Sequence, residues 1–177
     1  MNASFPTHLT TRRLGADQDL TAVDHPVFHA GQRLLIPVKK GSDARRAISY
    51  AIRRRAEGCD VSVCLLHVEE QFDEKGMRNF WLWQSPLGKT RQRKIFTTAM
   101  RMLSGVDIEV AAYVRYGAVV FTILDAAEEL DCHEIVIPAP PAGVLRWLSR
   151  NVVTALLTRQ RSVQVVLARQ DGTAILL

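Results

Sequence analysis

The residues best placed for binding chemistry form the loop at residues 138–143 (Pro-Ala-Pro-Pro-Ala-Gly). The apolar run at residues 135–137 predicts a buried strand, and residues 144–157 carry an apolar face with helical spacing, so the loop joins a strand to a helix. In open parallel sheets, ligands lie outside the carboxyl ends of strands, and helix starts favour phosphate groups. We therefore interpret this loop as the position of the candidate binding site.

The loop has almost none of the glycines that a phosphate-binding loop requires. Glycine serves there because a chain without Cβ can bring several backbone N–H groups around one anion. Pro138 and Pro141 instead fix φ, and each removes an N–H group. The loop therefore predicts weak binding of nucleotide phosphates.

Other residues that could do chemistry have simpler interpretations. Gly88-Lys89-Thr90 is similar to the end of a P-loop, but Trp83 stands where that motif needs a glycine. His67, at a strand end, could reach a ligand, although a core histidine paired with backbone is favoured. Cys132 and His133 would point to opposite faces of a strand, so they indicate a helix-to-strand junction and not a nucleophile with its base.

The three cysteines predict neither a metal site nor a disulfide. Cys59, Cys64 and Cys132 are odd in number and fit no metal-ligand spacing. We expect reduced thiols that pack as small core residues, with no metal and no cofactor.

Apolar runs alternate with amphipathic segments along the chain, which predicts an α/β domain. The first two runs flank a helix, and such a βαβ unit requires a right-handed crossover and a parallel sheet. Pro37 is expected at the carboxyl end of its strand. The third strand alternates, with Asp107 and Glu109 facing away, which is typical of an edge. Strands are expected at residues 33–38, 61–68, 106–114, 134–137 and 163–168, and helices between the Gly41-Ser42-Asp43 cap and Gly58 and at residues 90–103, 118–130 and 144–157.

The domain organisation follows from where this pattern starts and stops. Residues 1–31 are polar and aperiodic, so we expect an arm that is poorly ordered. Residues 32–170 form the domain, and residues 69–87, rich in aromatic side chains, form an insertion or lid within it. Residues 171–177 are a tail.

Several short stretches, in the same order, resemble the universal stress protein family. Residues 35–38 (Leu-Ile-Pro-Val) with Gly41-Ser42 resemble the family's opening strand and turn, and residues 65–68 (Leu-Leu-His-Val) resemble its second strand. Residues 115–117 (Arg-Tyr-Gly), a helix and the run at 135–137 resemble its fourth unit. The resemblance covers residues 33–169. It implies an adenine nucleotide alpha hydrolase-like fold, in which an open five-stranded parallel sheet of order 3-2-1-4-5 has helices on both faces.

The resemblance also implies where a ligand would bind, and this sequence departs from the family there. Nucleotide-binding members carry Gly, two residues, Gly, nine residues, Gly and then Ser or Thr, and these positions hold Pro138, Pro141, Asn151 and Val152. Lys39 stands where those members have an aspartate. We therefore expect a degenerate site without ATP, formed by Val38, Lys39, Val68, Pro138, Pro141, Gly143, Asn151 and Val152.

Members of the family are usually dimeric, which implies a homodimer here. In the order 3-2-1-4-5 the last strand is an edge, and it lacks the charges that protect free edges. The tail adds apolar surface to the same expected dimer interface. The expected dimer strand contains Val163, Val165, Val166 and Leu167.

The composition and charge indicate which kind of partner and which cellular location to expect. The 177 residues carry a formal net charge of +5 and are 47% hydrophobic, as in ordinary globular proteins. No stretch approaches the ~18 apolar residues of a membrane span, and the N-terminus has no apolar signal segment, so we expect a cytoplasmic protein without a membrane contact. Arginines gather on outward helix faces, which a solvated surface explains best. These arginines include Arg45, Arg46, Arg53, Arg54, Arg55, Arg159 and Arg161.

Together these features predict a universal stress protein-like binding or regulatory protein of the stress response, not an enzyme. Its ligand would be a small anion or a carboxylate of an unknown protein partner at the mouth of the sheet. One alternative is a nucleotide-binding protein or hydrolase with an unconventional loop. Another is a binder of acidic partners through the arginine faces, with nucleic acid possible but not favoured.

Overall fold

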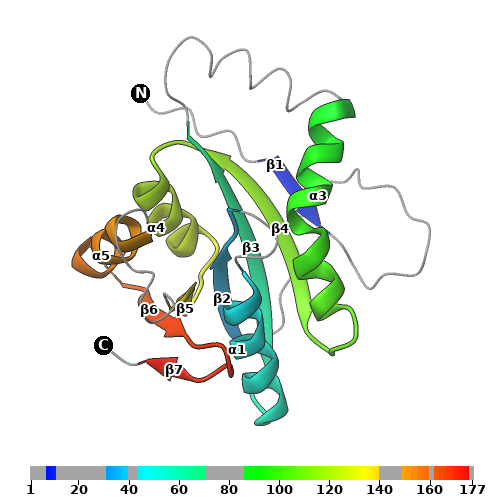
Figure 1. Cartoon of the computed structure of the whole chain (residues 1–177), viewed down its shortest axis with the longest axis vertical. Coiled ribbons are helices and arrows are strands. Elements are labelled where there is room, and N and C mark those ends of the chain that lie inside the picture. Colours follow the sequence, from blue (N-terminus) through cyan, green and yellow to red (C-terminus); the bar gives the residue numbers. More distant parts are fainter. Residues whose placement is uncertain are drawn as a thin grey trace.

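A single twisted sheet with helices on both faces forms the body of the molecule (Figure 1). The computed structural model describes residues 7–10, 31–39, 44–70, 86–139, 149–159 and 162–175, without the side chains of residues 7–10, 86–93 and 149–151. The strands are β1 (Thr7–Thr10), β2 (Gln32–Pro37), β3 (Val61–Glu69), β4 (Glu109–Tyr116), β5 (Glu134–Pro138), β6 (Gln164–Ala168) and β7 (Ala174–Ile175). The helices are α1 (Arg45–Ala56), α3 (Pro86–Leu103), α4 (Val119–Glu129) and α5 (Ser149–Arg159).

The predicted parallel core is confirmed. Strands β4, β3, β2, β5 and β6 are neighbours in that order, and every pair among them is parallel. Numbered along the sequence from β2, this is the expected order 3-2-1-4-5. Parallel neighbours need a crossover between them, and the helices that provide these crossovers cover the sheet.

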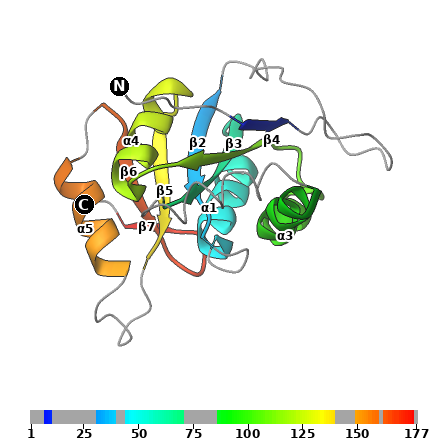
Figure 2. The same cartoon turned by 90° about the horizontal axis from the view of Figure 1, so that it is seen from above.

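Alternation along each strand sends side chains into two separate cores. In β2, Leu34 and Ile36 pack under α1 and α3, whereas Leu35 faces α4 and α5. Figure 2 shows the same division, with α1 and α3 on one face of the sheet and α4 and α5 on the other. Because both faces are covered, the inner strands are buried almost throughout, which is why they read as continuous apolar runs.

Pro37 ends β2, as its missing N–H group requires. It is the last paired residue, opposite Leu66 of β3. The next residue, Val38, still donates its N–H to the Leu66 carbonyl oxygen at 2.7 Å, and the chain then leaves the sheet. The proline therefore marks the carboxyl end of the strand, as predicted.

Both expected edge strands were assigned wrongly, because each carries a further, antiparallel neighbour. Residues Thr7–Thr10, within the expected arm, form β1 on β4, and the tail residues Ala174–Ile175 form β7 on β6. The sheet therefore has seven strands and not five. The alternation at Asp107 and Glu109 marks only the entrance to β4, whose residues 111–115 are all buried.

A tight turn folds β7 back onto β6. Asp171 accepts hydrogen bonds from the N–H and the hydroxyl of Thr173, at 3.0 and 2.7 Å. Gly172 takes a positive φ of 78° and packs against the backbone of Ser49 in α1. This left-handed turn reverses the chain beside β6 and covers part of the predicted dimer strand.

The helix boundaries differ from the prediction mainly at their starts. Helix α1 begins at Arg45 after Ala44, which makes no side-chain capping bond, and the expected cap at residues 41–43 lies outside the described residues. It ends before Gly58, whose φ is +88°. Helix α3 begins at Pro86, inside the expected insertion, since proline suits a first helical turn. No described helix is long and apolar enough to cross a membrane.

Candidate functional site

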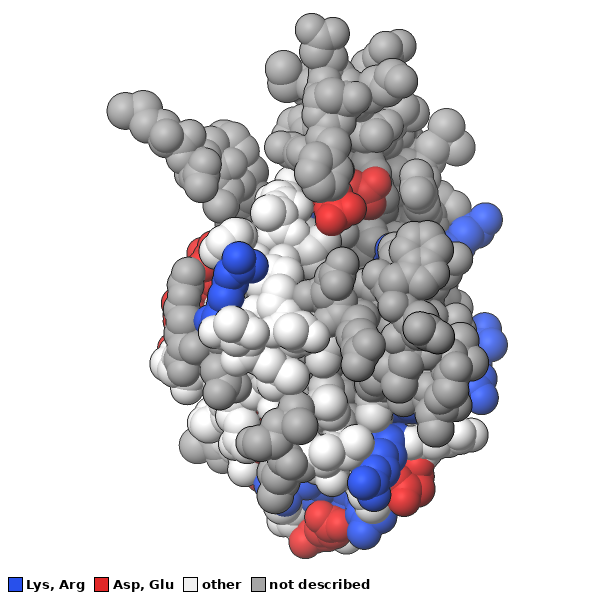
Figure 3. Space-filling model, turned by 60° about the vertical axis from the view of Figure 1, so that its left-hand side comes forward, with Lys and Arg blue, Asp and Glu red and all other residues white. Residues whose placement is uncertain are grey.

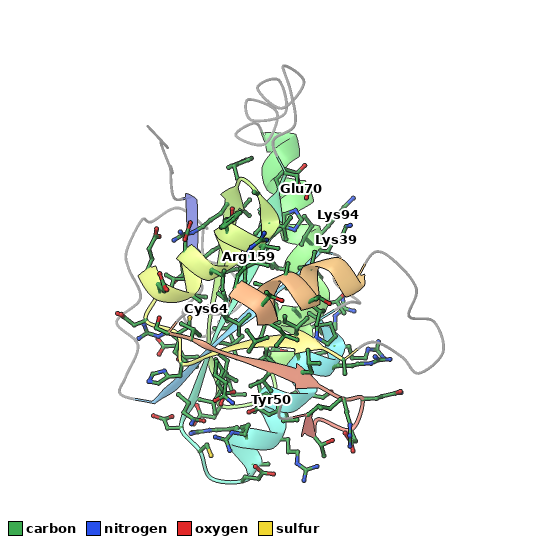
Figure 4. All side chains as sticks on the ribbon, turned by 90° about the vertical axis from the view of Figure 1, so that its left-hand side faces the viewer. Lys39, Tyr50, Cys64, Glu70, Lys94 and Arg159 are labelled. Atoms are coloured by element: carbon green, nitrogen blue, oxygen red, sulfur yellow. The ribbon has the colours of Figure 1, made fainter. Side chains whose placement is uncertain are left out.

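The candidate site lies where β2, β3 and β5 end, at one end of the sheet. Lys39 follows β2, Glu70 follows β3, and Ala139 follows β5. Figure 4 labels Lys39, Glu70 and Lys94 of α3 in the same upper part of the molecule, above Cys64 and Tyr50. This end is the mouth of the sheet, the position that the sequence predicts for a ligand.

His67 fixes the ends of β2 and β3 relative to each other. Its side chain is buried, with Nδ1 2.7 Å from the Val38 carbonyl oxygen and Nε2 3.1 Å from Glu69 Oε2. A carbonyl oxygen only accepts, so Nδ1 donates to it. The interpretation of His67 as a core histidine paired with backbone is confirmed.

The start of the predicted binding loop is tied to its neighbours. The N–H group of Ala139 donates to the Ala168 carbonyl oxygen at 2.7 Å, which extends the pairing of β5 with β6. The Ala139 carbonyl oxygen accepts a hydrogen bond from Arg46 Nη1 of α1. Pro138 has no N–H group. The first two loop residues therefore offer no free backbone donor to an anion.

The structure brings only part of the predicted site together. Val38 and Lys39 follow the end of β2, which lies between β3 and β5, and Pro138 ends β5. Val68 and Val152 are half-buried and pack against the core on the α4 and α5 side, so their side chains serve packing. Asn151 belongs to α5, but its side chain and the predicted residues Pro141 and Gly143 lie outside what the structure describes.

The mouth carries charges of both signs. Lys39 and Lys94 are exposed, and Arg46 is half-buried with its guanidinium on the Ala139 carbonyl oxygen. Glu69 is half-buried against His67, and Glu70 is exposed. Sequence reasoning placed Arg46 on a solvated helix face. Only the packing of the first turn of α1 beside the end of β5 shows its role, because no local signal distinguishes it from Arg45.

The remaining candidates have structural roles. Cys132 is buried and His133 is exposed, with His133 Nδ1 accepting the Arg33 N–H at 3.1 Å, as expected for a helix-to-strand junction. A hydrogen bond with Cys132 and burial raise the pKa of the Cys64 thiol well above its usual value, so Cys64 is a poor nucleophile. All three cysteines are free, and no group of His, Cys, Asp or Glu among the described residues could hold a metal ion.

The fold and the position of its mouth define an open, doubly wound α/β protein of the adenine nucleotide alpha hydrolase-like class. The sequence of residues 31–168 matches the model of the universal stress protein family. The match spans more than half of the chain, and the chain belongs to that family. The predicted membership is thereby confirmed.

Solved structures share the fold at low sequence identity. The hypothetical protein PH0823 matches with a TM-score of 0.58 and 20% identity, over 78% of this chain and 96% of its own. A universal stress family protein of Arabidopsis thaliana, At3g01520, solved with AMP bound, has a TM-score of 0.54 and 14% identity, over 78% and 92% of the chains. UspA of Lactobacillus plantarum has a TM-score of 0.50 and 16% identity, over 80% and 100%. No curated protein is significantly similar in sequence.

Proposed function

We propose that this protein is a binding or regulatory member of its family. Its mouth no longer binds ATP and instead binds a different, smaller anion. The observation that carries this proposal is the start of the loop. Pro138 has no N–H group, and the N–H of Ala139 is engaged by Ala168 at 2.7 Å. A second proline at position 141 removes a further donor. A phosphate chain needs several backbone N–H groups that point at it, an arrangement called a nest. The start of this loop lacks these N–H groups, so it cannot act as a nest.

Side-chain cations replace the backbone donors in this proposal. Lys39 is exposed at the end of β2, where nucleotide-binding members carry an aspartate, so the charge at that position is reversed. Lys94 of α3 lies toward the same end of the sheet (Figure 4). The matching ligand is a small anion or a carboxylate of a protein partner, held by charge and not by a backbone nest. The protein would act in the cytoplasm without catalysis.

Calorimetry with ATP and ADP tests the loss of nucleotide binding. We expect no binding at micromolar concentrations by the native chain, because three lost donors at about 1 kcal/mol each weaken a site by roughly a hundredfold or more. A variant with Pro138→Gly, Pro141→Gly, Asn151→Gly, Val152→Ser and Lys39→Asp should gain affinity. Micromolar affinity of the native chain would overturn the proposal and favour the nucleotide-binding alternative.

Titration with citrate and sulfate, followed by tryptophan fluorescence, tests the anion site. Lys39→Ala should weaken the response about fivefold, since a charge-assisted hydrogen bond is lost. Arg101→Ala is the matched control. Arg101 is exposed in the last turn of α3, and its substitution removes the same positive charge away from the mouth. If Lys39→Ala binds like the native protein, Lys39 does not form the site.

The proposal includes a homodimer formed along the last strands. Members of the family commonly form homodimers, and the apolar side chains of β6 are buried on both faces of the sheet. Strand β7 pairs only with Leu167 and Ala168, so the edge that a second copy could approach consists of β7 and the first residues of β6.

A further inference from the structure

A cavity of about 280 Å³ lies at the opposite end of the sheet from the mouth. It is formed where β3 and β4 begin, between the turn after α1 and the turn before β4. Its polar and charged lining includes Arg55, Asp60, Ser62, Asp107 and Glu109. Figure 3 shows acidic and basic side chains gathered at the lower end of the molecule, where α1 also ends in Figure 1.

The residues that line this cavity carry more negative than positive charge. Arg55 of α1 bridges Asp60 and Asp107, with Nη1 3.1 Å from Asp60 Oδ1 and Nη2 2.8 Å from Asp107 Oδ2. Glu109 adds a third carboxylate, and its side chain has no hydrogen bond or ion pair with any described residue. Among the described residues that line the cavity, one guanidinium therefore faces three carboxylates, and this lining attracts positive charge.

Ser62 provides a second, independent observation. Ser62 is only 6% exposed, it lines the cavity, and its Oγ has no hydrogen-bond partner within the described part of the chain. Ser62 lies opposite Glu109 in the register of β3 and β4, so the two side chains stand on the same face of the sheet. A buried hydroxyl without a partner is unfavourable, and a ligand with an N–H group would satisfy it.

The spacing of the carboxylates decides the class of ligand. No described group of three acidic or histidine side chains is placed to hold one metal ion, which argues against an inorganic cation. An extended organic cation can instead reach separated carboxylates with separate N–H groups. A four-carbon diamine fits within about 280 Å³.

We propose that this cavity, named here the amino-end cavity, binds a small organic cation with ammonium groups, through Glu109, Ser62 and the Asp60–Asp107 pair. This site is distinct from the mouth, where anion binding is proposed, and it does not rest on the function proposed above. The side chain of Arg55 bridges the two aspartates, so Glu109 provides the carboxylate that this bridge leaves for the ligand's charge.

Calorimetric titration with 1,4-diaminobutane at fixed low ionic strength tests this site, and 1,4-butanediol serves as the uncharged analogue of equal length. We expect a Kd on the order of 1 mM for the diamine, as suits a ligand of so few atoms, and no binding of the diol. Ser62→Ala should weaken diamine binding about fivefold, and Glu109→Gln about threefold. Glu128→Gln on α4 makes the same charge change outside the cavity wall and should bind like the native protein.

Folding does not obscure the result. Ser62→Ala removes a hydroxyl that has no partner among the described residues, so without diamine its melting temperature should equal or exceed that of the native protein. Equal binding of diol and diamine would overturn the proposal, as would unchanged diamine binding in both Ser62→Ala and Glu109→Gln. Anion binding at Lys39 should be the same in these variants, so the two sites are tested separately.

Discussion

At the scale of single residues, three glycines differ in what a Cβ atom would cost. One would suffer both backbone strain and a steric clash, one would suffer backbone strain alone, and one would suffer neither. A Cβ at Gly172, where φ is +78°, would lie 2.8 Å from the Ser49 carbonyl oxygen of α1. Gly58 has a φ of +88° with nothing within 4 Å, and Gly105 has neither problem. Gly172 therefore holds the β6–β7 turn on α1 in a way that no other residue could.

We expect the three Gly→Ala variants to fall into three classes. Gly105→Ala should change the free energy of unfolding by less than about 0.5 kcal/mol. Gly58→Ala should cost about 1 kcal/mol from the left-handed φ alone. Gly172→Ala should cost about 3 kcal/mol, since the backbone must also shift. Urea denaturation measures all three, and a Gly172→Ala variant as stable as Gly58→Ala would contradict the packing of this turn on Ser49.

Tyr50 connects α1 to β5 and makes the free energy of unfolding depend on pH in the alkaline range. Its hydroxyl donates to Glu134 Oε2 at 2.8 Å, and burial with this hydrogen bond raises the pKa of Tyr50 to about 12 from its usual 10. The folded state thus holds the proton more tightly than the unfolded state. This contribution to stability is complete below pH 10 and is lost as the pH rises to about 12.

Tyr50→Phe has no such titration. We expect it to be about 1 kcal/mol less stable than the native protein at pH 7, because Glu134 loses a donor. Between pH 10 and 12 its free energy of unfolding should fall less steeply than that of the native protein. Thermal unfolding across this range measures the difference, and parallel pH profiles would show that Tyr50 does not contribute.

At the scale of elements, β1 covers an edge of the parallel sheet. Residues Thr7–Thr10 pair with Ala111–Val114 of β4. Strand β1 therefore satisfies backbone N–H and C=O groups along the rim of the sheet. Its role is to protect β4 from pairing with another chain.

Deleting residues 1–30 should uncover that edge while the parallel sheet still folds. We expect cooperative unfolding and an unchanged far-ultraviolet circular dichroism spectrum per domain residue, but more aggregation at high protein concentration. Deleting only residues 1–6 keeps β1 and is the matched control. If the longer deletion fails to fold, residues 1–30 belong to the domain and are not an accessory arm.

At the scale of the whole molecule, the two rims of the sheet differ. The β4 rim carries β1 along four residues, whereas the β6 rim carries β7 along two. Residues Gln164 and Val165 have no strand neighbour among the described residues on the side away from β5. The β6–β7 rim is therefore the more open one, and it is where we propose that the homodimer forms.

We expect the native protein to sediment as a dimer at micromolar concentration. Ile175→Lys should give a monomer, because it places a charge in the proposed seam on β7. Phe121→Lys introduces the same charge at an exposed apolar residue of α4, 48% exposed, and should remain dimeric. A dimeric Ile175→Lys variant would place the interface elsewhere, and a monomeric native protein would exclude the dimer.

Sequence alone determined the elements whose signals are local. Continuous apolar runs predicted the buried strands, Pro37 marked the end of β2, and the apolar stripe of residues 118–130 predicted α4, whose Ile123, Leu124 and Ala127 are buried. The family resemblance then supplied the strand order, and the altered glycine positions predicted a departure at the mouth. These features are readable because each depends on residues close together in the chain.

Only the tertiary structure decided what happens between distant segments. Strands of four and two residues, such as β1 and β7, have no periodic signal, and their pairing depends on a free neighbour being present. Arg46 reaches Ala139, 93 residues away, and Ser62 meets Glu109 only through the β3–β4 register. Such contacts depend on how helices and strands pack in three dimensions, so one arginine or serine in the sequence looks like any other until the chain has folded.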